Sequence, residues 1–177
     1  METKNIKQEI KEHFLKHPTE KLRVREIERK LQLPLPSVIR YCKELETEGT
    51  LTIFQIGNAS FYTADKTNEN YILEKKLFNL KSIFRSGLVN HLKQELSNPN
   101  VILFGSFSKG EDIEESDIDL YVETSSSKNV NLEKFEKILD KKIQLIKSKS
   151  LKQIKNKALA NNIINGINLN GQVEVFK

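Results

Sequence analysis

The stretch Phe104–Leu120, FGSFSKGEDIEESDIDL, decides how this part of the chain folds. A Gly-Ser pair ends an apolar run, and after ten further residues Asp117 and Asp119 flank a single isoleucine. Side chains alternate between the two faces of a β-strand, so a strand here carries both aspartates on one face and buries its apolar side chains on the other. The sequence therefore predicts a strand, a turn at Gly-Ser, and a second strand that holds two carboxylates side by side.

The paired aspartates suit a divalent cation, because two close carboxylates repel one another unless a cation lies between them. Mg²⁺ prefers oxygen ligands and is commonly held by one or two carboxylates together with substrate phosphates. Gly105 permits a sharp turn and the close approach of a phosphate, and Ser106 with the backbone N–H groups that follow it faces the same anion. The stretch thus predicts a site for Mg²⁺ and a phosphate group.

The charge around these aspartates differs from that of the rest of the chain. Between Val101 and Glu123 there is one lysine against seven acidic residues, a net charge of −6. From Thr124 onward eleven lysines face four acidic residues, a net charge of +7, and the whole chain carries +5. An acidic segment on a basic chain suits a cation beside an anion-binding surface, although an exposed acidic loop on a lysine-rich protein has the same composition.

Length and composition set the class of protein. The 177 residues suit one domain or two small ones, and 37% hydrophobic with 30% charged residues fits a soluble globular protein. No apolar run approaches the roughly 20 residues of a membrane helix, and the charged N-terminus lacks the apolar core of a signal peptide. The single cysteine, Cys42, excludes an internal disulfide and a multi-cysteine zinc site, so we expect a cytoplasmic protein.

The first 66 residues predict three helices followed by a β-hairpin. Apolar residues at helical spacing indicate helices over residues 5–15, 24–31 and 37–48, separated by turns that contain proline. Two alternating segments, 50–55 and 59–64, flank a turn around Gly57 and predict the hairpin.

This order of elements, in the segment from Arg25 to Ala64, resembles the winged helix-turn-helix domain of prokaryotic transcription regulators. The resemblance implies that helix 37–48 enters the major groove of double-stranded DNA and that the hairpin forms the wing. The candidate DNA contacts are Lys30, Ser37, Arg40, Tyr41, Lys43 and Asn58. Residues 1–60 carry a net charge of only +2, and such domains also serve in dimerisation or protein docking, so both roles stay open.

Residues 67–98 predict a connecting helical segment. Leucine or phenylalanine recurs every three or four residues from Leu73 to Leu96, and Gly87 interrupts the pattern. We expect one or two helices whose apolar stripe lies in the core or in a contact between two copies of the chain. The expected domains are a winged helix-turn-helix domain at 1–66, this connector, and a second domain at 99–177.

The second domain alternates strands and helices, which indicates an α/β unit on a mixed sheet and an α+β fold class for the whole chain. We expect strands over residues 101–104, 116–123 and 141–146, helices over 132–139 and 158–167, a short helix capped by Ser150, and an edge strand in the tail from Ile167.

The opening stretch resembles the signature of the minimal nucleotidyltransferases of the DNA polymerase β superfamily, which is Gly-Ser, ten residues, and Asp-x-Asp. Here Gly105-Ser106 is followed by ten residues and then by Asp117-Ile118-Asp119. The resemblance spans Val101 to Val122, and the closing segment LANNIINGINLNGQ also looks like the end of such a domain.

The resemblance implies a Mg²⁺-dependent transfer of a nucleotidyl group from a nucleoside triphosphate, with ATP as the expected donor. Asp117 and Asp119 would be the catalytic and metal-binding residues. The implied nucleotide-binding residues are Gly105, Ser106, Lys109, Gly110 and Ser116.

One position departs from the family pattern. The family supplies a third carboxylate from a later strand between apolar residues, and the matching residue here is Gln144. A glutamine offers a carbonyl oxygen but accepts no proton near neutral pH, and losing a general base costs about 10²–10⁴-fold in rate. Three explanations stay open: the strand is aligned differently, Glu123 or Glu174 substitutes, or the domain binds nucleotide and Mg²⁺ with little turnover.

Two functions follow from these features. The first is an enzyme that transfers AMP to a protein or small molecule; family members of this size often act as antitoxins that modify a HEPN-type toxin. The second is a DNA-binding regulator whose nucleotidyltransferase domain senses nucleotide or dimerises. A pure adaptor is a third option. We also expect a homodimer.

Overall fold

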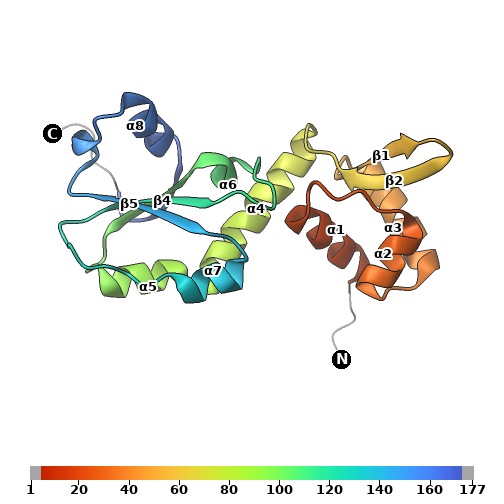
Figure 1. The fold of residues 1–177 in the computed structure, drawn as a ribbon, viewed down its shortest axis with the longest axis horizontal. Helices are drawn as coiled ribbons and strands as arrows, with labels where there is room; N and C mark the ends of the chain where they lie inside the picture. Colours follow the sequence, from red (N-terminus) through yellow and green to blue (C-terminus); the bar gives the residue numbers. More distant parts are fainter. Residues whose placement is uncertain (1–4, 173–177) are drawn as a thin grey trace. The chain divides into compact units, whose positions relative to one another are not determined.

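A computed structural model describes residues 5–172 of the chain (Figure 1). The chain splits into two compact units, Met1–Phe78 and Asn79–Lys177, and the division falls within helix α4 (Glu69–Ser86). Among the described residues, no helix has the length and apolar character needed to cross a membrane.

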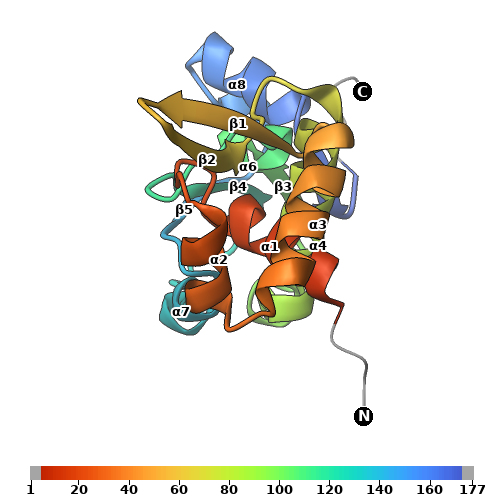
Figure 2. The ribbon, with the colours of Figure 1, turned by 90° about the vertical axis from the view of Figure 1, so that its right-hand side faces the viewer.

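The N-terminal unit consists of a three-helix cluster and a two-stranded hairpin, which Figure 2 shows from the side of this unit. Its elements are α1 (Ile6–Lys16), α2 (Val24–Leu31), α3 (Leu35–Thr47), β1 (Leu51–Ile56) and β2 (Ala59–Ala64). Helix α3 begins two residues before its expected start, because Pro36 occupies the first turn, where its missing N–H costs nothing.

Apolar side chains from all three helices and from the hairpin form one core in this unit. Its fully buried members are Ile10, Phe14, Ile27, Val38, Cys42 and Leu45. The hairpin strands pair antiparallel from Leu51↔Ala64 to Ile56↔Ala59, and its far end is exposed. The helices and the hairpin thus pack as one unit.

The C-terminal unit is built on a mixed four-stranded sheet in the order β5-β4-β3-β6. Its elements after α4 are α5 (Leu88–Glu95), β3 (Asn100–Phe104), α6 (Gly105–Lys109), β4 (Ile118–Glu123), α7 (Glu133–Leu139), β5 (Ile143–Ser148), the 3₁₀ helix η1 (Leu151–Gln153), α8 (Lys157–Ile164) and β6 (Ile167–Asn170). Strand β4 runs parallel to β5 and antiparallel to β3, and β6 is the expected edge strand beside β3. The expected tail beyond residue 172 lies outside the described residues.

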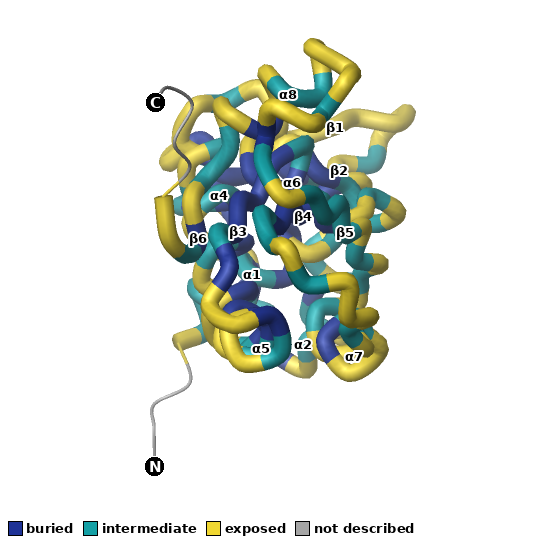
Figure 3. Tube along the Cα trace, turned by 90° about the vertical axis from the view of Figure 1, so that its left-hand side faces the viewer, coloured by how far each residue is buried: buried dark blue, intermediate teal, exposed yellow. Residues whose placement is uncertain are grey.

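Helices cover both faces of this sheet (Figure 1). On one face Ile118, Leu120 and Val122 of β4 pack in a core with side chains of α5 and α7. On the other face Tyr121 packs with Leu151 of η1 and with side chains of α8. Figure 3 shows that the central strands β3 and β4 are more buried than the outer strands. The alternation in β4 therefore leaves Asp119 on the face of Tyr121, as period-two alternation requires.

The apolar stripe of the connecting segment is only partly in the core. Leu88, Leu92 and Leu96 are buried, but Leu73, Leu77 and Phe84 are each more than half exposed. The buried face of α4 consists of Tyr71, Lys75, Asn79 and Ile83. Leu73, Leu77 and Phe84 therefore lie outside the core of the chain, because the buried face carries Lys75 and Asn79, which bind the carbonyl oxygens of Leu15 and Phe107. The other expectation, a contact between two copies of the chain, stays a prediction.

Candidate nucleotide and metal site

Gly105 lies at the point where β3 passes into α6, with a left-handed φ of +74°. A Cβ atom there would lie 3.1 Å from Cγ of Asp119 and would overlap the carboxylate oxygen Oδ2. The turn therefore needs glycine for two reasons, its backbone conformation and the space that Asp119 occupies. Gly105 and Asp119, fourteen residues apart in the sequence, are thus in direct contact across the two neighbouring strands.

The two aspartates lie at the start of β4. The strand begins at Ile118, one residue after Asp117, so Asp117 precedes the strand and is exposed, whereas Asp119 is half-buried within it. Burial raises the pKa of the Asp119 carboxyl, and the charge of Asp117 raises it further. The charge of Asp117 therefore disfavours the ionised form of Asp119, and a cation between the two carboxylates would relieve this repulsion.

Gln144 is the residue of β5 that pairs with Asp119. The register of the parallel ladder is Asp119↔Gln144, and paired residues of neighbouring strands share a face roughly 5 Å apart. Gln144 is exposed on β5, the edge strand. The register thus places Gln144 beside Asp119, where the sequence predicts the position of the third carboxylate; that this position serves the reaction stays a prediction.

Glu123 cannot replace this carboxylate. It lies four residues beyond Asp119 on β4, roughly 13 Å away at the rise of a β-strand. Its Oε2 accepts hydrogen bonds from the Leu151 N–H at 3.0 Å and the Tyr121 hydroxyl at 3.3 Å, and its Oε1 accepts one from Asn100. Glu123 is thus bound at the opposite end of the sheet. Glu174, the other candidate, lies outside the described residues.

These side chains fit a cation that arrives with its own phosphate ligands. Two carboxylate-bearing residues and a glutamine amide supply too few oxygens for a protein-only Mg²⁺ site, but enough for one shared with a nucleotide. Within residues 5–172 no three His, Cys, Asp or Glu side chains gather as a metal-binding cluster. The arrangement is therefore compatible with Mg²⁺ bound through Asp117, Asp119 and phosphate oxygens.

The remaining candidate nucleotide-binding residues lie around the loop between α6 and β4. Gly110 caps α6 and donates its N–H to the Ser106 carbonyl. The Ser116 hydroxyl accepts a hydrogen bond from the Ile113 N–H at 2.9 Å, so it closes the end of the loop. Lys109 is exposed at the last turn of α6. Ser106 lies in the first turn, next to Gly105.

Two buried polar residues and one that is largely buried hold this loop, and the sequence patterns do not identify them. They are Asn79 of α4, Asp112 of the loop itself, and Lys141, two residues before β5. Nothing in the sequence marks them, since Asn79 sits in an apolar helix and Asp112 and Lys141 are surrounded by other charged residues.

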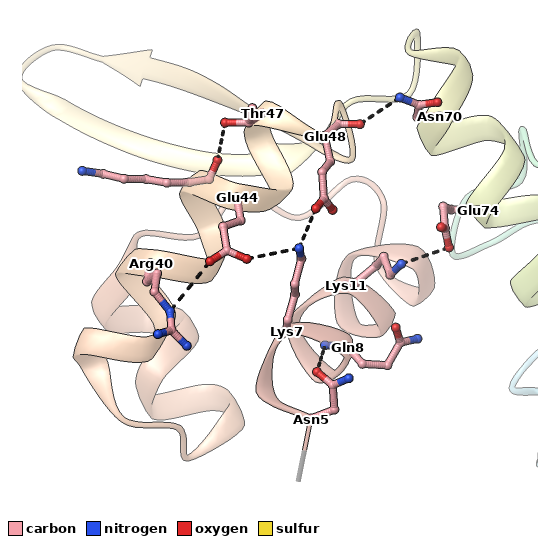
Figure 4. A network of polar contacts seen from close by, with 11 residues as sticks. Asn5, Lys7, Gln8, Lys11, Arg40, Glu44, Thr47, Glu48, Asn70 and Glu74 are labelled. Carbon is pink, nitrogen blue, oxygen red and sulfur yellow. Dashed lines mark hydrogen bonds and ion pairs between the residues drawn. The ribbon is translucent and has the colours of Figure 1, made fainter. Parts of the chain in front are cut away.

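Among the candidate DNA contacts, Arg40 and Lys43 are exposed on α3, whereas Lys30 forms a 2.5 Å ion pair with Glu20 of the same unit. The Arg40 guanidinium stacks over the ring of Tyr41, 4.3 Å from its centroid. Its Nε lies 3.8 Å from a carboxylate oxygen of Glu44, as Figure 4 shows for this ion pair.

The other two candidates lie apart from this exposed pair. Ser37 is in the first turn of α3, and Asn58 is exposed at the hairpin turn. The unit therefore exposes two basic side chains of α3, and Lys30, also exposed, forms an ion pair with Glu20 of the same unit.

Comparison with known proteins gives two findings. The family model described as nucleotidyltransferase domain matches residues 85–167. A protein of Methanocaldococcus jannaschii, named "Putative protein adenylyltransferase MJ1379", is 40% identical over 84 residues, which cover 44% of this chain and 83% of that protein. No solved structure matches the chain at a significant level.

Proposed function

The chain belongs to the nucleotidyltransferase family, and we propose that it transfers AMP from ATP to a hydroxyl group of a protein or small-molecule acceptor. The observation that carries this proposal is the contact between the Gly105 turn and Asp119, with Asp117 beside them. The name of the M. jannaschii relative favours a protein acceptor.

In this proposal Asp117 and Asp119 hold Mg²⁺, while the turn at Gly105-Ser106 receives the phosphates. Bound Mg²⁺ would neutralise charge on the phosphate oxygens. The acceptor oxygen attacks the α-phosphorus, the bond to the bridging oxygen breaks, and pyrophosphate leaves. Gln144 contributes a neutral amide beside Asp119 and takes no proton, so the acceptor's proton leaves to another base and the transfer is slow.

Label transfer from α-labelled ATP tests this directly. The protein is incubated with Mg²⁺, labelled ATP and candidate acceptors, including a HEPN-type partner and the chain itself. Asp117→Asn and Asp119→Asn should each lower transfer by at least about 10²-fold, the scale of losing one electrostatic group at a reaction centre. Glu115→Gln, an exposed acid in the same loop, is the matched control and should leave transfer unchanged. Undiminished transfer in both aspartate variants would reject the site.

We also propose a second candidate function, contact with double-stranded DNA through α3. The order of three helices and a hairpin and the exposed Arg40 and Lys43 favour it. The expected DNA affinity falls steeply with salt, since bound phosphates release counterions. Arg40→Ala and Lys43→Ala should each reduce the salt dependence by about one counterion, whereas Lys66→Ala, an exposed lysine after β2 that is not a candidate contact, should leave it unchanged. Absence of binding to any duplex at low salt would eliminate this function.

We propose in addition that the chain forms a homodimer through Leu73 and Leu77, because α4 leaves both more than half exposed. Sedimentation equilibrium of wild type and of Leu77→Lys tests it. A dimer that becomes a monomer supports the proposal, and a monomeric wild type rejects it.

A further inference from the structure

The loop between α6 and β4 contains a buried carboxylate that takes no part in the proposed chemistry. Asp112 is only 2% exposed. Its Oδ1 accepts a hydrogen bond from the Asn79 amide at 2.6 Å, and its Oδ2 lies 3.5 Å from the Lys141 ammonium. This loop joins the Gly-Ser turn to the two aspartates, so its shape sets where they lie relative to one another.

Lys141 is bound to the backbone of the same loop. Its side chain is 10% exposed, and Nζ donates to the carbonyl oxygens of Ile113 at 2.6 Å and Glu114 at 3.1 Å, with that of Ser116 at 3.4 Å. An ammonium has three donors and no acceptor, so this one is directed almost wholly to the loop. Carbonyl groups of a part-buried loop need such donors, since an unpaired one costs free energy.

Asn79 connects the loop to α6. Besides Asp112, its side-chain amide donates to the Phe107 carbonyl at 2.9 Å, and Asn79 itself is 1% exposed. The three residues therefore join α4, α6, the loop and the approach to β5 in one buried cluster, here called the loop anchor: Asn79, Asp112 and Lys141.

The loop anchor is directly connected to the strands of the site. The Ile118 N–H donates to the Lys142 carbonyl at 2.8 Å, which begins the ladder that pairs Asp119 with Gln144. Lys141 is the residue before Lys142, and the last carbonyl near its ammonium belongs to Ser116, the residue before Asp117. A shift of Lys141 would therefore move both the loop end and the start of β5.

We propose that Asn79, Asp112 and Lys141 are positioning residues that hold Asp117 and Asp119 in register with the Gly105 turn. The proposal rests on the function proposed above. The three residues act through the backbone: the Lys141 ammonium reaches Ser116 at its carbonyl oxygen, and the Asn79 amide reaches Phe107 at its carbonyl oxygen. Stability alone does not explain them, because burying a carboxylate and an ammonium carries a large desolvation penalty and apolar residues of similar volume often stabilise as well or better. A fixed loop geometry accounts for the buried charges.

The experiment measures loop order and ligand affinity separately. The variants are Asp112→Asn, which keeps the shape and removes the charge, Lys141→Met and Lys141→Arg. The control is Lys142→Met, whose side chain is 80% exposed beside Glu136. Hydrogen exchange is followed for residues 110–118 without ligand, and titration calorimetry measures the affinity for Mn²⁺ with a non-hydrolysable ATP analogue.

Lys141→Met and Asp112→Asn should speed exchange in residues 110–118 by at least about tenfold, while exchange in β3 stays slow, and should weaken ligand affinity by a similar factor. Lys141→Arg keeps the positive charge, so it should retain part of the slow loop exchange and part of the ligand affinity. Lys142→Met should equal wild type in both measurements. If Lys141→Met does not fold, Asp112→Asn and Lys141→Arg are compared with wild type and Lys142→Met in the same two measurements.

Two results would overturn the proposal: loop exchange that stays unchanged in the folded variants, or faster loop exchange with wild-type affinity. Failure of the proposed function is distinguishable. A wild-type protein that binds no Mn²⁺ and nucleotide rejects the nucleotide site, and the exchange measurement still decides whether the loop anchor orders the loop.

Discussion

The N-terminal unit pairs its charges with one another, whereas the candidate site leaves like charges together. The Lys7 ammonium lies 2.5 Å from a carboxylate oxygen of Glu48 and 3.1 Å from one of Glu44, and the Lys11 ammonium lies 3.1 Å from one of Glu74 (Figure 4). At the site Asp117 and Asp119 repel each other, and within residues 5–172 no basic side chain forms an ion pair with either.

This difference separates charges that support the fold from charges that face a ligand. Exposed ion pairs contribute only about 0–1 kcal/mol each, so those of the N-terminal unit are close to neutral for stability. Two close carboxylates without a partner oppose folding, and the chain retains them next to a turn that only glycine fits. The second arrangement indicates a binding site, and four changes test the contrast.

The largest expected effect is a gain of transfer activity in Gln144→Asp. This change adds a third carboxylate and a proton acceptor opposite Asp119, and a restored general base raises the rate by about 10²–10⁴-fold. Label transfer from ATP measures it, with Gln144→Ala as the control for loss of the amide alone. A rate equal to that of Gln144→Ala would show that the position takes no part in the reaction. Without Mg²⁺ the added charge should lower the melting temperature.

The next effect is a loss of nucleotide binding in Gly105→Ala. The new methyl group overlaps the Asp119 carboxylate and the backbone is in the left-handed region, so Asp119 must move. We expect affinity for nucleotide with Mg²⁺ to fall by about 10- to 100-fold, the range for losing one or two charge-assisted hydrogen bonds. Gly57→Ala is the control, since it has a similar φ and open space around it. Equal affinities for Gly105→Ala and wild type would contradict the assigned contact.

A smaller effect is stabilisation of the ligand-free protein by Asp119→Asn. The folded-state pKa of Asp119 is raised, so the folded state holds the proton to higher pH, and the ionised group destabilises it once the pH exceeds the unfolded pKa. At pH 7 the melting temperature of Asp119→Asn should therefore exceed that of wild type by about 1–3 °C. With saturating Mg²⁺ and nucleotide, wild type should have the higher melting temperature, because only wild type binds the nucleotide with its metal. A lower melting temperature for the ligand-free variant would indicate that Asp119 supports the fold.

The smallest effect concerns His13, which is buried beside Glu20 in the N-terminal unit. Burial lowers its pKa even though its Nε2 lies 2.8 Å from a Glu20 oxygen. The unfolded chain therefore binds a proton near pH 6.5 that the folded chain resists, and stability falls as the pH drops below about 6.5. Thermal melts at pH 7.5 and 5.5 should show a loss that His13→Gln reduces by about a degree. If His13→Gln loses as much melting temperature between pH 7.5 and 5.5 as wild type does, other groups cause the pH dependence.

Much of the architecture could be predicted from local pattern. Ile118 and Leu120 of β4 are buried as expected, although the strand begins at Ile118 and leaves Asp117 before it. The Ser150 hydroxyl caps η1 by accepting a hydrogen bond from the Lys152 N–H, and α4 and α5 separate at Gly87. Each of these features depends on a few residues that are adjacent in the sequence, so a local sequence pattern is enough to predict it. The apolar strand around Gln144 also follows from pattern, but its pairing with Asp119 is a result of the sheet register.

In helix α4 local pattern left two outcomes open, the core or a contact between copies. Leu73, Leu77 and Phe84 lie outside the core, and the buried face carries Lys75 and Asn79. A polar side chain can be buried on a helix when a hydrogen-bond acceptor lies beside it. The acceptors of Lys75 and Asn79 are carbonyl oxygens that lie 60 and 28 positions away in the sequence. Such long-range acceptors leave no mark on the helix itself.

The sequence by itself determined most of the elements, the Gly-Ser turn, the two aspartates and a glutamine within the apolar strand that follows them, because each depends on residue type and spacing. Only the tertiary structure decided that Glu123 is too far away to replace the family's third carboxylate, that Gly105 touches Asp119, and that Asp112 and Lys141 lie buried behind the loop. Those facts depend on contacts between segments far apart along the chain, which packing brings together and spacing does not encode.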